Sequence, residues 1–229
     1  MKRHNSEQWI PVREALCRVL AQPLSGLVSM SSALVIEEAE QWSIPVSDRE
    51  ALRKWGLPRH PLFTRRPQCG PEPVLVPNRA GEYERRLVRE GQRLYDLGYW
   101  GTDPTSCVVG VVPGEGRVLC LLPEPITVED LPEILRPCHS GLYKPAVSLF
   151  NTSLAQYVET AWRWHAALQI LRQIEEPAPT AAEVELVQHD DRLYACLDLV
   201  VNVVRRVDRA ADAESRPSVW TELIRENSV

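Results

Sequence analysis

One stretch of the chain predicts a short strand, residues 146–150, that continues directly into an amphipathic helix. Ser153 and Gln156 fit a capping box, in which the serine hydroxyl accepts from the third amide of the helix and the glutamine side chain reaches back. The apolar residues that follow recur at helical spacing and form one face: Leu154, Tyr157, Val158, Ala161, Trp164, Leu168 and Leu171. A strand joined in this way to a helix with one apolar face indicates an α+β domain.

Further helices are predicted towards both ends of the chain. The N-terminal ones are expected at residues 9–20, 33–42 and 48–55, the last capped by Asp48 and ended by Gly56. In the C-terminal part, a second capping box begins a helical stretch that runs to about residue 210, and a short amphipathic helix follows. The capping box is formed by Thr180 and Glu183, and the short helix is expected at residues 218–224.

The middle of the chain is rich in proline, glycine and β-branched residues, which is typical of strands joined by turns. Its clearest pair is residues 106–112 with residues 116–122, joined at Pro113, Gly114 and Glu115 as a tight hairpin. Both runs are apolar on both faces, so this hairpin should lie centrally in the sheet, under helices. Residues 84–95 fit either a helix or a strand.

These elements predict an α+β fold with a mostly antiparallel central sheet and flanking N- and C-terminal helices. A chain of 229 residues has room for one sizeable domain, or for one domain with a helical extension. We therefore expect a single domain over residues 1–229, in which residues 175–229 form a helical C-terminal extension.

Composition limits the classes of partner. The formal net charge of −5 argues against direct nucleic-acid binding, because neutralising phosphates requires a basic face. The N-terminus lacks the apolar region of a signal peptide and no apolar run approaches bilayer length, so neither export nor membrane insertion is expected. The six cysteines contain no CxxC pair, and Cys107, Cys120 and Cys196 lie in apolar settings that favour buried free thiols. A reduced, cytoplasmic protein is predicted.

The sequence offers no convincing catalytic, cofactor or metal site. No two of the five histidines stand at metal-ligand spacing with a cysteine or carboxylate, and the adjacent Cys138 and His139 point apart. The glycine-containing run at residues 110–116 lacks the Gly-Lys-Ser/Thr ending of a phosphate loop and leads into a strand. An undetected hydrolase that uses His139 or His165 with a carboxylate remains an alternative.

An aromatic group, Tyr95, Tyr99 and Trp100, precedes the hairpin and allows two interpretations. It can form a core edge beside the hairpin, or it can be an exposed anchor for a protein partner, because Trp and Tyr concentrate in binding hot spots. The second interpretation places a partner-binding surface at four residues. These are Tyr99, Trp100, Asp103 and Glu115.

Four short motifs follow one another along the chain. Each is a common fold element, so their order and spacing are more informative than any single motif. They are Gly56-Leu57-Pro58 with Phe63, Gly116-Arg117-Val118, Asn151-Thr152-Ser153-Leu154, and Asp208 with Ala210 and Trp220. In this order they resemble the SUKH immunity proteins of bacterial polymorphic toxin systems, specifically the fourth subgroup. The resemblance covers residues 48–174 best and the ends more loosely.

The resemblance implies an α+β domain that is not an enzyme and that binds a cognate toxin to block it. It also implies that a cleft of the sheet serves as the recognition surface, but no binding residue transfers by motif. The acidic balance of this chain would suit a basic toxin, such as a nuclease or a deaminase. A scaffold or regulatory protein-interaction domain of the same fold, without a toxin partner, is the alternative. Residues 175–229 could serve the core, a partner or a dimer.

Overall fold

A computed structural model describes residues 9–60, 63–65, 69–101, 107–174, 181, 183–214 and 218–226. Its α-helices are α1 (Trp9–Leu20), α2 (Leu24–Leu27), α3 (Val46–Trp55), α4 (Glu82–Leu87), α5 (Leu154–Leu171), α6 (Glu183–Val207), α7 (Arg209–Glu214) and α8 (Val219–Glu226). Its 3₁₀ segments are η1 (Met30–Ser32), η2 (Glu37–Gln41), η3 (Val128–Asp130) and η4 (Glu133–His139). Its strands are β1 (Ala33–Leu34), β2 (Leu57–Pro58), β3 (Phe63–Thr64), β4 (Tyr95–Trp100), β5 (Val108–Val111), β6 (Val118–Leu121), β7 (Ile126–Thr127), β8 (Tyr143–Lys144) and β9 (Val147–Asn151).

The main sheet has five strands in the order β3-β4-β5-β6-β9, and every neighbouring pair is antiparallel. The predicted hairpin, β5 with β6, occupies the centre of this sheet. Two smaller two-stranded sheets, β1–β2 and β7–β8, lie outside it. The α+β fold with a mostly antiparallel sheet and helices at both ends of the chain is therefore confirmed.

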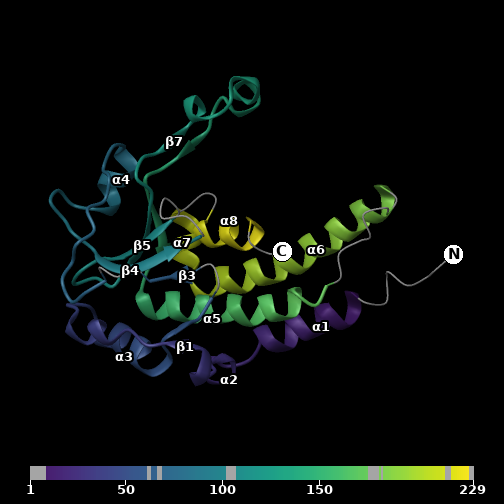
Figure 1. Ribbon diagram of the computed structural model, residues 1–229, viewed down its shortest axis with the longest axis horizontal. Coiled ribbons are helices and arrows are strands. Elements are labelled where there is room, and N and C mark those ends of the chain that lie inside the picture. The colour runs from purple at the N-terminus through teal and green to yellow at the C-terminus, as the bar shows by residue number, and fades with distance from the viewer. Residues whose placement is uncertain are drawn as a thin grey trace.

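Side chains alternate between two cores on opposite faces of the sheet, as the two-residue period of a strand requires. On β6, Val118 and Cys120 face the larger core, whereas Leu119 and Leu121 face the smaller one. Helix α5 supplies the larger core and contacts α1, α3 and α6 (Figure 1). The smaller core contains Leu87 at the end of α4 and residues of β9. Burial on both faces explains why both hairpin strands are apolar throughout.

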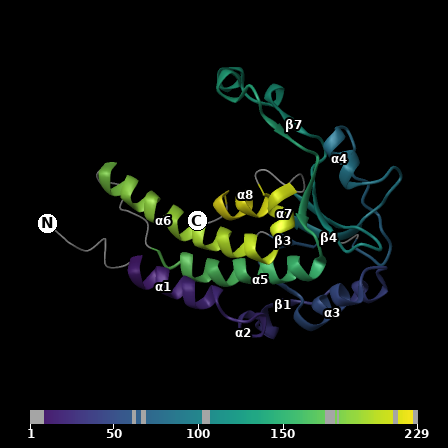
Figure 2. The ribbon, with the colours of Figure 1, turned by 180° about the vertical axis from the view of Figure 1, so that it is seen from behind.

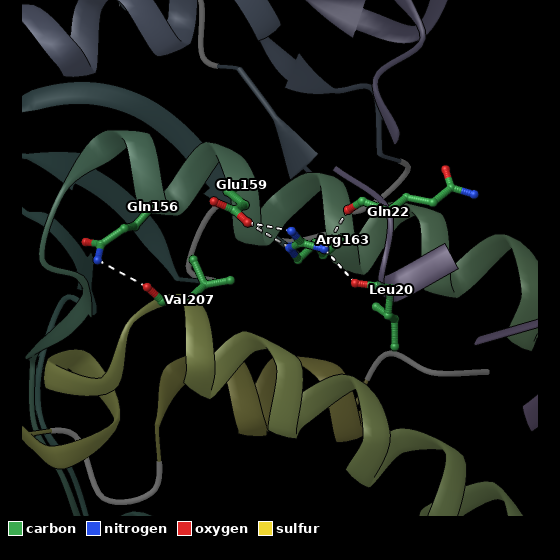
Figure 3. A network of polar contacts seen from close by, with 6 residues as sticks. All are labelled: Leu20, Gln22, Gln156, Glu159, Arg163 and Val207. Atoms are coloured by element: carbon green, nitrogen blue, oxygen red, sulfur yellow. Dashed lines mark hydrogen bonds and ion pairs between the residues drawn. The ribbon is translucent and has the colours of Figure 1, made fainter. Parts of the chain in front are cut away.

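Helix α5 also ties together the ends of two neighbouring helices through polar side chains. Arg163 is held by Glu159 and donates to the carbonyls of Leu20 (2.7 Å) and Gln22 (3.3 Å), at and just beyond the end of α1 (Figure 3). Gln156 donates to the carbonyl of Val207 (3.2 Å) at the end of α6. Carbonyls at helix ends lack partners within their own helix, so these bonds satisfy groups that would otherwise be left open.

The predicted cap of α5 is confirmed in its main feature. The hydroxyl of Ser153 accepts from the backbone amide of Gln156 (3.2 Å). The glutamine side chain differs from a capping box, because its amide reaches Val207 and its oxygen accepts from the hydroxyls of Thr152 (2.6 Å) and Ser153 (3.0 Å). The serine thus caps the helix, while the glutamine joins α5 to α6.

The helix predicted at residues 33–42 is wrong. Residues 33 and 34 form β1, which pairs with β2, and a 3₁₀ segment follows. The buried residues in this stretch, Ile36, Ala39 and Trp42, are three apart, which is the period of a 3₁₀-helix rather than of an α-helix. This spacing was a signal in the sequence, but the pairing of β1 with β2 depends on residues more than twenty positions away.

Asp48 does not cap α3 as predicted. The helix begins at Val46 after Pro45, and Asp48 lies within its first turn with only 1% of its surface exposed. Its carboxylate accepts from the backbone amide of Ala155 (2.9 Å) in the first turn of α5. Burial raises the pKa of this carboxyl group, against the effect of the backbone hydrogen bonds. Asp48 therefore joins α3 to the start of α5. The predicted end of α3 at Gly56, which has a positive φ of 59°, is confirmed.

Two of the cysteines predicted to be free are paired. Cys107, just before β5, and Cys120, on β6, lie with their Cα atoms 5.5 Å apart, and the structure joins them by a disulfide. Their positions in one hairpin bring them together, although they are 13 residues apart in sequence and form no CxxC pair. Cys196 is free and buried as predicted, whereas Cys17 and Cys138 are exposed.

The C-terminal helices belong to the same core as the rest of the protein. Val200 and Val204 of α6 and Trp220 and Ile224 of α8 are buried in the larger core with residues of α1 and α5. Figure 2 shows, from behind, that α6 lies beside α5 and that α8 lies on the other side of α6. Among the roles left open for residues 175–229, the described part therefore serves the core. The predicted cap residue Thr180 lies outside the described residues.

None of the described helices has the length and apolar character needed to span a bilayer.

The buried face of α5 yields a stability prediction. Trp164 has none of its surface exposed, as the helical phase predicts, so Trp164→Ala should lower the free energy of unfolding by about 3–5 kcal/mol. The change should be measured by denaturant unfolding. Gln169→Ala, at an exposed position of the same helix, should change it little. Equal stabilities for wild type and Trp164→Ala would contradict this packing.

Candidate partner-binding surface

Trp100, one of the four residues predicted to bind a partner, lies in the core. Only 5% of its surface is exposed, and its indole N–H donates to the hydroxyl of Tyr157 (2.7 Å) on α5. Its ring also packs against Phe63 (5.2 Å between ring centroids). Trp100 therefore corresponds to the other interpretation of the aromatic group, a core edge, and has little surface to offer a partner.

A β-bulge in β4 explains this placement. Asp96 pairs with Gly110, but Gly98 pairs with the next residue of β5, Val109, so β4 carries one extra residue. Gly98 has a φ of 133°, and a Cβ there would lie 2.6 Å from the carbonyl oxygen of Thr64. The extra residue reverses the alternation, so that Trp100 rather than Tyr99 continues the inward face begun by Tyr95 and Leu97.

The other three predicted residues do not form one cluster. Tyr99 is half-buried and pairs with Val108 at the beginning of β5. Glu115 lies beyond the opposite end of β5, in the hairpin turn, where its carboxylate contacts Arg117 (2.6 Å) and Arg89 (3.5 Å). Asp103 lies outside the described residues. Tyr99 is thus partly exposed near one end of β4, between β3 and β5, and is separated from Glu115 by the length of β5.

The two histidines considered for hydrolysis, His139 and His165, lie in different environments. His139 is exposed at the end of η4, and His165 lies on α5 near Trp162 and His60, with ring centroids 5.7 and 6.2 Å away. Burial lowers the pKa of both His60 and His165, the former to about 4. No group of three or more potential metal ligands occurs among the residues that the structure describes.

A buried polar network joins two of the motifs found in the sequence. Asp208, 4% exposed, accepts from the side chain of Asn151 (3.1 Å) and from the backbone amide of Thr152 (2.6 Å). Asn151 in turn accepts from the indole N–H of Trp220 (2.8 Å). Asp208 also accepts from the amide of Ala211 (3.1 Å) in the first turn of α7. The network fastens the C-terminal helices to the end of β9, so these motif residues hold the fold together.

An arm, residues 123–146, projects from the body and contains β7, η3, η4 and β8 (Figures 1 and 2). It leaves the sheet between β6 and β9. Because Tyr99, Val108, Leu121 and Val147 are successive partners across the sheet, the arm starts from the same end of the sheet as Tyr99. Between its two strands the arm contains the 3₁₀ segments η3 and η4.

The base of the arm is fixed by contacts to three parts of the body. The buried Glu84 on α4 accepts from the hydroxyl of Tyr143 (2.9 Å) and from the amide of Ala146 (3.0 Å). Lys144 forms an ion pair with Glu222 of α8 (2.7 Å). At the beginning of the arm, the side chain of Asn78 donates to the carbonyl of Pro123 (2.9 Å). The arm is therefore anchored at both of its ends.

The tip of the arm is ordered by its own hydrogen bonds. Asp130 accepts from the amide and the hydroxyl of Thr127 (2.7 and 3.0 Å), which closes a capping box around η3 and lowers the pKa of the aspartate. Arg136 donates to the carbonyls of Leu131 and Glu129 (3.0 Å each). These bonds leave two adjacent apolar residues of η4 facing solvent. They are Ile134, 84% exposed, and Leu135, 44% exposed.

A five-stranded antiparallel sheet, a central capped helix and a projecting arm define an α+β protein. A sequence model of the SUKH-4 immunity protein family matches residues 33–226. The chain belongs to this family, and the match extends through α6 and α8, beyond the residues that resemble the family best by motif. The family implies an immunity-type function against a toxin. Neither a curated protein nor a solved structure matches the chain significantly.

The network around Asp208 predicts a large effect of a single substitution. Asp208→Ala should lower the free energy of unfolding by at least about 3 kcal/mol, because buried donors at the end of β9 lose a charged acceptor. Denaturant unfolding measures the change. Asp198→Ala is a matched control on α6, since its pair with Arg225 is about half exposed and should contribute less than about 1 kcal/mol. Similar losses for both variants would contradict the role of the network.

Proposed function

We propose that this protein is a non-enzymatic, cytoplasmic immunity protein that binds and neutralises a cognate bacterial toxin domain. Membership of the SUKH-4 immunity protein family over residues 33–226 is the observation that carries this proposal. Protection then requires only that a surface of the protein covers a working surface of the toxin. The role needs no cofactor, metal or bond-making step.

The charge of the chain supports a basic toxin, such as a nuclease or a deaminase. A toxin that acts on nucleic acid needs a basic surface to neutralise phosphates. A partner with a net charge of −5 would be drawn to that surface, and the attraction would speed association. The same charge disfavours competition by nucleic acid for the immunity protein.

The proposed location is compatible with the cysteine pair. In a reducing cytoplasm Cys107 and Cys120 would be held as thiols. The hairpin that carries them keeps its antiparallel pairing from Val108 to Leu121 through backbone hydrogen bonds, so its shape does not depend on the disulfide.

Co-expression tests this function directly. The toxin domain encoded beside this gene should stop bacterial growth when produced alone, and co-production of this protein should restore growth. An unrelated immunity protein is the control and should not protect. Failure of this protein to protect against, or to bind, that toxin domain would sink the proposal and would favour a scaffold or regulatory role.

The same assay separates binding from catalysis. A variant with both His139→Ala and His165→Ala should protect cells as well as the wild type, because neither imidazole is required to cover a toxin surface. Loss of protection with unchanged thermal stability and unchanged toxin binding would instead favour the hydrolase alternative.

A further inference from the structure

We infer that the tip of the arm is the element that contacts the toxin, and that Ile134 and Leu135 enter an apolar hollow within a basic toxin surface. The inference rests on the proposed function and names the contact surface that this function requires. It differs from the position expected from sequence, which centred on β4 and the hairpin turn.

Exposed apolar surface is the first argument. Ile134 and Leu135 are adjacent in η4, in the segment that connects β7 to β8, and both are exposed. Figures 1 and 2 show that the arm carrying this segment projects from the body. The arm is a two-stranded element, so it cannot bury these side chains in a core of its own. Adjacent large apolar side chains surrounded by polar ones are typical of surfaces that bind another protein.

The arm is already ordered before any partner binds. Glu84, Lys144 and Asn78 fix the base, and the bonds of Asp130 and Arg136 fix the tip. An arm that is already ordered loses little conformational freedom when a partner binds.

The charge of the arm identifies the chemistry of the partner. Three exposed carboxylates lie close in sequence to the apolar pair, in η3 and at the start of η4: Glu129, Asp130 and Glu133. Lys144 pairs with Glu222 at the base, and Arg136 donates to carbonyls within the tip, where the three carboxylates outnumber its one guanidinium. The tip therefore offers an apolar pair flanked by residues whose net charge is negative. Its complement is a toxin surface that is basic around an apolar hollow, as the substrate-binding side of a nucleic-acid-acting toxin would be.

Two pairs of variants test the inference against the purified toxin domain encoded beside this gene, with its catalytic residue inactivated. Ile134→Ser with Leu135→Ser should raise the Kd at least about 30-fold, the loss expected of hot-spot residues. Glu129→Gln with Glu133→Gln should slow association and make it less sensitive to salt. Binding should be followed by surface plasmon resonance, and the melting temperature of each variant should stay at the wild-type value.

Matched controls use the same chemistry elsewhere on the surface. Val184→Ser with Val187→Ser removes two exposed apolar residues of α6, and Glu37→Gln with Glu40→Gln removes two exposed charges of η2. Both controls should bind like the wild type. Wild-type binding by the arm variants, or equal losses in arm and control variants, would overturn the inference and leave the proposed function standing. Absence of binding by the wild type would overturn both.

Discussion

The hydrogen bonds of Asn151 are the interaction on which the rest of the structure depends. This residue ends β9 just before the cap of α5, and its side chain bonds to Asp208 after α6 and to Trp220 in α8. One amide therefore joins the sheet to three C-terminal helices. Without it, the buried carboxylate of Asp208 and the indole of Trp220 would lose partners in the core, which is costly where water cannot replace them.

Beyond this junction, hydrogen bonds along α5 join it to the other helices. Gln156 secures the end of α6, Arg163 secures the end of α1, and Asp48 of α3 bonds to the first turn of α5. The sheet and its helices become a fixed platform, and Glu84 and Lys144 attach the arm to it. In this way, interactions deep in the fold determine where an exposed surface is presented.

Local patterns in the sequence were enough to predict the parts of the fold that depend on near neighbours. The hairpin, the strand before α5 and the serine cap at Ser153 follow from alternation and turn chemistry. The bulge at Gly98 could not be predicted in this way, because it depends on the close approach of β3, and it changed the expected exposure of Trp100. The role of Asp48 likewise depends on a partner more than a hundred residues away.

The arm shows the same limit for function. Its projection could not be predicted from local patterns, because Glu84, Asn78 and Glu222 hold its base from distant parts of the chain. A sequence pattern reports that Ile134 and Leu135 are apolar, and only the packed structure reports that nothing described in the fold covers them at the tip.

We propose that the arm is a preformed binding surface for the toxin. Hydrogen–deuterium exchange of the protein, alone and with the toxin domain encoded beside its gene, would locate the bound surface. Bound toxin should slow exchange in peptides covering residues 126–144 and should leave peptides from the first half of α6 unchanged. Slowed exchange on α6 or elsewhere, with the arm exchanging as fast as in the free protein, would contradict it.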